Sequence, residues 1–257
     1  MKINKVTLAF LIIFSSILFG QQVEKLIDEG DKLTDSFNNK GALDKYIQAD
    51  KLSPKNWDIL WRISRSYVNI GTHMPENTDD QKDAQLAIYQ KALSYADLSV
   101  TLGSDKSITY LRRAITNGRI ALFKGVFSVG SVVNSIKSDC EKAIKLNNGG
   151  NYVQGLAHYV LARTNAKISE KWAPARAVLG LGWADNEIAL KEFKTAISIF
   201  PDFRMFYIDY ARSLIREDEY GTAREMLNKC ISSSKQEEDD DIRLAEAKQL
   251  LNEIKNK

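Results

Sequence analysis

The segment GALDKYIQADKLSP, residues 41–54, decides the fold. It places a small residue at Ala42, an aromatic residue at Tyr46, a second small residue at Ala49 and a proline at Pro54. Steps of three and four residues are the period of a helix, and a proline beyond the last small residue favours a turn. The same pattern returns in ALKEFKTAISIFP, at Ala189, Phe193, Ala196 and Pro201.

Working outward, three more segments carry weaker copies without the proline, at Ala92, Ala96 and Ser99, at Ile136, Cys140 and Ala143, and at Ala223, Leu227 and Cys230. Apolar residues at helical steps predict a first helix before each copy, near residues 26–33, 60–67, 108–115, 152–159 and 207–214. These are positions of the tetratricopeptide unit. The sequence therefore predicts an all-α, tetratricopeptide-like superhelical solenoid over residues 22–257, with about five helix pairs.

Long inserts separate the two halves of three copies, over residues 69–83, 117–135 and 160–188. Such inserts often gather on a binding face. The apolar insert residues are candidates for a partner or membrane surface, or they fold back as extra helical layers: Phe127, Trp172, Leu179 and Trp183. A final amphipathic stretch, residues 242–254, predicts a capping helix at the C-terminal end of the stack.

The order of these parts resembles the regulator of microtubule dynamics family, which is also found as bacterial tetratricopeptide proteins. The matching segments are NWDILWRISRSY at 56–67, KGVFSVGSVVNSIKSDCEKAIKLNN from Lys124, and the tryptophan-containing insert that ends in ALKEFKTAISIFPDF. The resemblance covers roughly residues 23–256. It implies an adaptor, which the family name associates with microtubules in eukaryotes, and it leaves the partner of this chain open.

The first twenty residues read as a signal peptide. Two lysines within residues 1–5 precede an apolar run over 6–19 and a small residue, Gly20. The run is shorter than the roughly 18–20 residues that span a bilayer. The sequence predicts export to the periplasm or cell envelope, with an uncleaved N-terminal anchor as the alternative. The 36 basic and 33 acidic residues are nearly balanced, which gives no indication of nucleic acid as a partner.

No set of residues predicts catalysis. His73 and His158 lack further ligands at metal-binding spacing. The LGLGW segment at 179–183 lacks the third glycine and the preceding strand of a dinucleotide site. Cys140 and Cys230 occupy core positions of different repeats, which favours two buried thiols over a disulfide. We therefore expect no catalytic residue, metal or cofactor.

Polar residues on the first helices should line the concave side of the solenoid. Arginine can hold a carboxylate with two hydrogen bonds, so an acidic peptide or a C-terminus is a reasonable ligand. The candidates for this groove are Asn56, Arg62, Arg65, Arg112, Arg113 and Asn117. The leading interpretation is a non-enzymatic protein-binding scaffold. The alternatives are a peripheral membrane adaptor held by the N-terminal segment or the 171–183 insert, and an enzyme with a site between the inserts.

Overall fold

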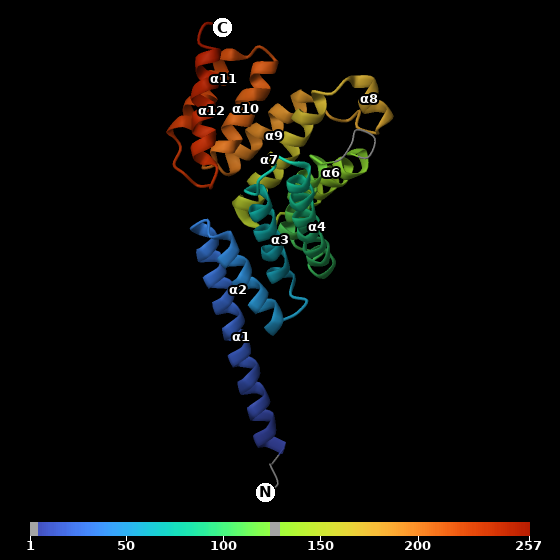
Figure 1. Ribbon diagram of the computed structural model, residues 1–257, viewed down its shortest axis with the longest axis vertical. Coiled ribbons are helices and arrows are strands. Elements are labelled where there is room, and N and C mark those ends of the chain that lie inside the picture. Colours follow the sequence, from blue (N-terminus) through green and yellow to red (C-terminus); the bar gives the residue numbers. More distant parts are fainter. Residues whose placement is uncertain (1–4, 124–128) are drawn as a thin grey trace. The chain divides into compact units, whose positions relative to one another are not determined.

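The computed structural model describes the backbone of residues 5–123 and 129–257, and the side chains of these residues from residue 20 onward (Figure 1). The regular elements of these residues are twelve helices. The chain divides into two compact units, Met1–Ser104 and Asp105–Lys257, which are described separately. Phe127, one of the predicted insert residues, lies outside the described residues. The all-α prediction is confirmed.

The first unit contains two helix pairs, α1 (Lys5–Asp35) with α2 (Asn39–Leu52) and α3 (Trp57–Thr72) with α4 (Asp79–Leu102). Helix α2 also packs on α3. The side chains of Ala42, Tyr46 and Ala49 are fully buried. Gly30 of α1 lies against Tyr46, so closely that a β-carbon at Gly30 would overlap the ring. The repeat pattern therefore works as expected: small residues let the helices approach, and the aromatic ring fills the space between them.

The polar insert at 69–83 is largely absorbed into helices. Helix α3 continues through Thr72, and α4 begins at Asp79, so only residues 73–78 connect them. The start of α4 is fixed by Thr78 and Gln81, whose side chains each hydrogen-bond the other's backbone N–H as a capping box. The lengthened copy is thus a long second helix rather than a long loop.

The second unit contains three helix pairs and a terminal helix. The pairs are α5 (Ser107–Ala121) with α6 (Val129–Leu146), α7 (Gly150–Ser169) with α9 (Asn186–Ile199), and α10 (Arg204–Arg216) with α11 (Tyr220–Ser232). Helix α12 (Asp240–Glu253) packs on α10 and α11. Together with the first unit, this gives the five pairs and the C-terminal capping helix that the repeats predict.

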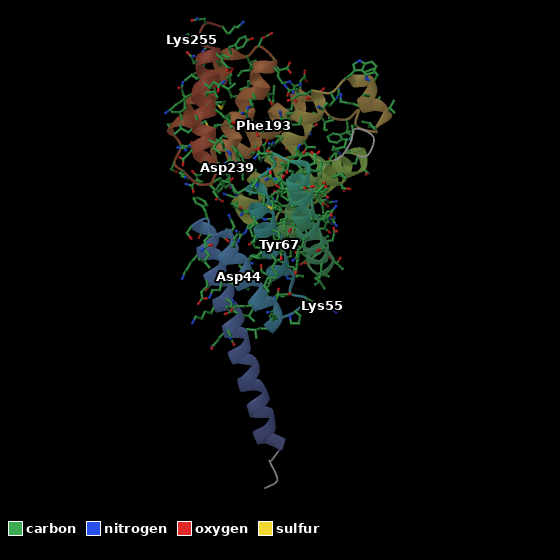
Figure 2. All side chains as sticks on the ribbon, viewed as in Figure 1. Asp44, Lys55, Tyr67, Phe193, Asp239 and Lys255 are labelled. Carbon is green, nitrogen blue, oxygen red and sulfur yellow. The ribbon has the colours of Figure 1, made fainter. Side chains whose placement is uncertain are left out.

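Aromatic rings form the centre of the second unit. Phe193 and Phe206 are fully buried, and the ring of Tyr159 stacks on Phe206 with 4.7 Å between centroids. Figure 2 labels Phe193 among the helices of this unit. Cys140 on α6 and Cys230 on α11 are buried free thiols, as their repeat positions predict. Burial raises the pKa of the Cys230 thiol to about 11, which keeps it protonated and unreactive.

The third insert contains a short helix, α8 (Ala173–Val178), and folds back on α6. Leu181 is buried, and the Trp183 indole N–H donates to Asn134 Oδ1 on α6 at 2.8 Å. Trp172 and Val178 stay 75% and 85% exposed. One side of the insert is therefore packed on the helices, and the other side lies in solvent.

Among the described residues, no helix combines the length and the apolar character that crossing a bilayer requires.

Candidate functional site

Two of the predicted groove arginines, Arg62 and Arg65 on α3, bind a carboxylate of their own chain. Arg62 Nε donates to Asp31 Oδ1 and Oδ2 of α1 at 3.1 Å, and Arg65 donates to Asp31 Oδ1 at 2.8 Å. The Tyr46 hydroxyl donates to the same carboxylate at 2.6 Å. Both arginine side chains are about 15% exposed or less. The Asp31 cluster (Asp31, Tyr46, Arg62 and Arg65) therefore joins the first helix pair to the second.

Charge pairing sets the ionisation of the Asp31 cluster. Burial opposes ionisation of Asp31, but the hydrogen bonds and charges of Arg62 and Arg65 outweigh it and lower the pKa of Asp31. Burial, with the neighbouring Asp31 carboxylate, raises the pKa of Tyr46 to about 12. The cluster is consequently charged as Asp31⁻ with two guanidinium groups at neutral pH.

We expect the Asp31→Asn variant to lose about 1–2 kcal/mol of unfolding free energy in the first unit near neutral pH. This value is reduced because the Asp31 side chain is 35% exposed, so solvent screens its charge. Because the pKa of Asp31 is lowered in the folded chain, its contribution is complete above the unfolded value of about 3.9 and is lost as pH falls through the folded value. Urea unfolding of both proteins at several pH values measures this. A stability difference that does not shrink as the pH falls further and further below the unfolded value of about 3.9 would contradict it.

The other predicted groove residues are buried or partly buried. Arg112 and Asn117 on α5 are only 7% and 9% exposed, and Arg112 donates to the Tyr152 hydroxyl at 2.9 Å. Arg113 makes two hydrogen bonds, at 2.8 and 2.7 Å, to the Asp139 carboxylate of α6. Asn56 caps α3 by accepting from the Asp58 N–H. Arg112 and Asn117 are thus buried, and the groove prediction for these residues stays a prediction.

A basic recess lies instead between α7 and α10, the first helices of the fourth and fifth pairs. It is a shallow hollow of about 20 Å³, roughly the room that one water molecule needs. Phe193 and Ala166 supply apolar surface, and charged side chains supply most of the rest. The residues lining the basic recess are Arg163, Ala166, Lys167, Glu170, Phe193, Asp209, Arg212, Ser213 and Arg216.

Buried hydrogen bonds fix the floor of the basic recess. Asp209 is 11% exposed and accepts from the Tyr159 hydroxyl at 2.7 Å and from Arg212 at 2.8 Å. Burial, followed by the Asp209 charge, raises the pKa of Tyr159 well above its ordinary value, so Tyr159 remains a donor. Arg212 also reaches Glu246 of α12 at 2.9 Å. The carboxylate of Asp209 is therefore held as a structural acceptor.

The rim of the basic recess carries excess positive charge. Arg163 lies 3.6 Å from Asp209 and Lys167 lies 3.1 Å from Glu170, yet their side chains remain 51% and 57% exposed. Arg216 donates to the backbone carbonyl of Ala166 and so orients its guanidinium along the same wall. Four cationic side chains face two carboxylates here. The arrangement can accept a carboxylate-bearing ligand, because N–H donors that carry charge form the stronger hydrogen bonds.

Sequence reasoning missed the basic recess although one signal pointed to it. Arg163 follows Tyr159 by one helical turn, and Arg212 and Arg216 are a further pair one turn apart on the fifth first helix. The arginines of the second and third pairs were preferred, but their acidic partners come from neighbouring helices. On sequence alone, a neutralised arginine and an available one look the same.

Metal and histidine chemistry find no further support in the described residues. Among residues 5–123 and 129–257, no group of three or more His, Cys, Asp or Glu side chains is placed to hold an ion. His158 Nδ1 lies 2.6 Å from Glu192 on α9, and His73 Nδ1 lies 2.9 Å from the Asn69 carbonyl oxygen. Each histidine thus has a partner that fits a structural role.

Comparison with solved structures identifies the fold. TTC0263, a tetratricopeptide protein of Thermus thermophilus, superposes with a TM-score of 0.64 at 14% identity, over 88% of this chain and 99% of that one. The pilF protein of Pseudomonas aeruginosa gives 0.56 at 11% identity, over 92% and 90%. No curated protein matches the sequence. At these identities the likeness shows the tetratricopeptide fold alone.

Family membership comes from the sequence itself. The family described as regulator of microtubule dynamics protein 1-3 matches residues 23–255, which include the later part of α1 and all of α2 to α12. This range agrees with the roughly 23–256 over which the resemblance was expected. The chain therefore belongs to the family of regulator of microtubule dynamics proteins 1-3.

Proposed function

We propose that this protein is a non-enzymatic scaffold that holds a partner protein by an acidic segment or a C-terminal carboxylate in the basic recess. The observation that carries the proposal is the rim, where Arg163 and Lys167 keep half of their side chains in solvent beside an apolar floor. A peptide bound there would pair its carboxylates with the cations of the rim. Stacked helix pairs are suited to this role, because they expose an extended concave surface.

The recess favours binding over catalysis. Its buried carboxylate, Asp209, already accepts hydrogen bonds from Tyr159 and Arg212 and has Arg163 close by, so its negative charge is compensated. A general base needs a group that can take a proton from the substrate. An enzyme with a site between the inserts is the alternative that this argument disfavours.

We also propose that the chain is exported and works in the cell envelope. The support is the sequence of residues 1–20, with its lysines, its apolar run and Gly20. The family name refers to microtubules, but an exported chain would meet its partner outside the cytoplasm. The mass of the protein recovered from the envelope tests this directly: loss of the first twenty residues supports a cleaved signal, and a full-length mass supports the uncleaved anchor.

The test of the scaffold is a paired charge removal. We expect the Arg163→Gln/Lys167→Gln variant to bind the envelope partner at least tenfold more weakly, since each charge-assisted hydrogen bond contributes about 1.5–3 kcal/mol. Affinity capture from the organism's own envelope, followed by titration of the recovered partner at two salt concentrations, measures the effect. Binding to the original chain should also weaken with salt.

The matched control is Lys229→Gln/Lys248→Gln. Both lysines are exposed on α11 and α12 outside the recess, so the control removes the same charge without touching the rim. It should retain the partner. Equal loss with both variants would show that net charge rather than the recess governs binding, and full retention by the rim variant would exclude the recess.

A further inference from the structure

The most exposed apolar side chains gather at one end of the second unit. Among large hydrophobic residues that the structure describes, the three highest exposures are Val178 at 85%, Leu122 at 76% and Trp172 at 75%. Leu122 directly follows α5, and the other two bracket α8. Single apolar residues scattered over a surface need no explanation. The presence of the three most exposed large apolar side chains at one end of the unit does need one.

Contacts between the two apolar inserts show why these residues share an end. Helix α5 ends and α6 begins there, and α7 ends and α9 begins there, because each pair is antiparallel. The third insert meets the start of α6 where Gly130 lies against the carbonyl of Leu179, and where Trp183 donates to Asn134. Figure 1 shows α8 standing beside the start of α6. The apolar tip (Leu122, Trp172 and Val178) therefore sits on a fixed base.

Two stretches of sequence at this end contain basic but no acidic residues, and the acidic residues Glu170 and Asp185 border the second stretch. The sequence contains no acidic residue between Ser107 and Ser138, nor between Lys171 and Ala184. The two stretches carry basic residues at this end, including Arg119, Lys171 and Arg176. The exposed Lys171 directly precedes the exposed Trp172, so the tip carries a cation that can approach an anionic surface.

We propose that the apolar tip docks on an anionic lipid bilayer, with Trp172 and Val178 in the interfacial layer and Lys171 against the headgroups. Tryptophan prefers this layer, because its ring is apolar while its indole N–H remains hydrated. Short surface helices with basic flanks bind by burying a few apolar side chains and by attracting anionic lipids. Arg176 donates to the Ala184 carbonyl, which closes the loop after α8, so docking orders little additional chain. This contact is separate from the basic recess.

The test uses fluorescence of the full chain with vesicles whose acyl chains are brominated, which quench a tryptophan that enters the bilayer. The Trp172→Phe variant isolates the signal of Trp172 from the other three tryptophans. This readout is local, so it reports the tip even if the N-terminal segment holds the chain on the vesicle. Phosphatidylglycerol vesicles are compared with phosphatidylcholine vesicles at the same lipid concentration.

We expect the Trp172 signal to be quenched by phosphatidylglycerol vesicles, with Val178→Asp or Lys171→Glu lowering lipid affinity about tenfold or more. Ile242→Asp, at an exposed apolar residue on α12, should leave quenching unchanged. The proposal would be overturned if the Trp172 fluorescence were not quenched, or if neither Val178→Asp nor Lys171→Glu changed the quenching. A dimer in sedimentation that Val178→Asp abolishes while lipids have no effect would also overturn it, because the occupant would then be a second copy.

Discussion

Replacing Phe193 with alanine should lower the free energy of unfolding of the second unit by about 3–5 kcal/mol. The ring is fully buried on α9 and lies within 6.0 Å of the rings of Tyr159 and Tyr210, measured between centroids. Removing it takes away apolar area and leaves a cavity between the fourth and fifth helix pairs, where the surrounding rings can collapse only in part. It also removes apolar floor from the basic recess.

Phe193→Leu is the matched control, because leucine restores most of the volume without the ring. We expect it to cost clearly less than Phe193→Ala. Urea unfolding followed by circular dichroism measures both, provided that the transition of the second unit is resolved from that of the first. Equal losses for the two substitutions would contradict the cavity argument and would indicate that ring-to-ring contacts dominate.

The second large effect is expected at Gly30, where alanine should destabilise the first unit by about 1–3 kcal/mol. An alanine in a helix is ordinarily better than glycine by up to about 1 kcal/mol. Here the added β-carbon would overlap the Tyr46 ring, which is fully buried. The ring cannot swing away cheaply, since its hydroxyl donates to Asp31 and accepts from Arg65.

The opposite change in the free energy of unfolding is expected for Gly118→Ala. Gly118 lies near the end of α5, and a β-carbon there would meet nothing within 4 Å. This substitution should be neutral or stabilising by up to about 1 kcal/mol. Thermal unfolding of the two variants side by side measures the difference in sign. A neutral Gly30→Ala would mean that α1 and α2 approach less closely than described.

The helix pairs could be predicted because their signal is local and repeated. Ala42, Tyr46 and Ala49 indicate a close helix pair within a few residues, and the copy at Ala189, Phe193 and Ala196 does the same. What could not be predicted was how far helices continue into apparent inserts. The start of α4 is fixed at Thr78 because Gln81 completes the capping box, a feature that the polar composition of the segment concealed.

The candidate site was harder to predict because the residues around an arginine decide whether its guanidinium group can bind a ligand. Arg62 and Arg163 are both arginines on first helices, but Arg62 meets Asp31 from thirty-one residues away, whereas Arg163 remains half exposed. Arg112 was expected to face a groove, and its side chain is covered beside Tyr152. Trp172 and Trp183 were both singled out as apolar insert residues, and only the fold shows that Trp172 is exposed while Trp183 hydrogen-bonds to α6.

The last turn of α7 has a consequence for how the two proposed surfaces would act together. Lys167 and Glu170 line the recess, and Trp172 begins the tip, so about five residues, or roughly 8 Å of helix length, separate them. A partner captured in the recess would be held within a side chain's reach of the membrane that the tip contacts. If that partner is itself attached to the bilayer, both proteins would diffuse in the same plane, which raises their effective concentration. A low affinity in the recess would then suffice for a long-lived complex.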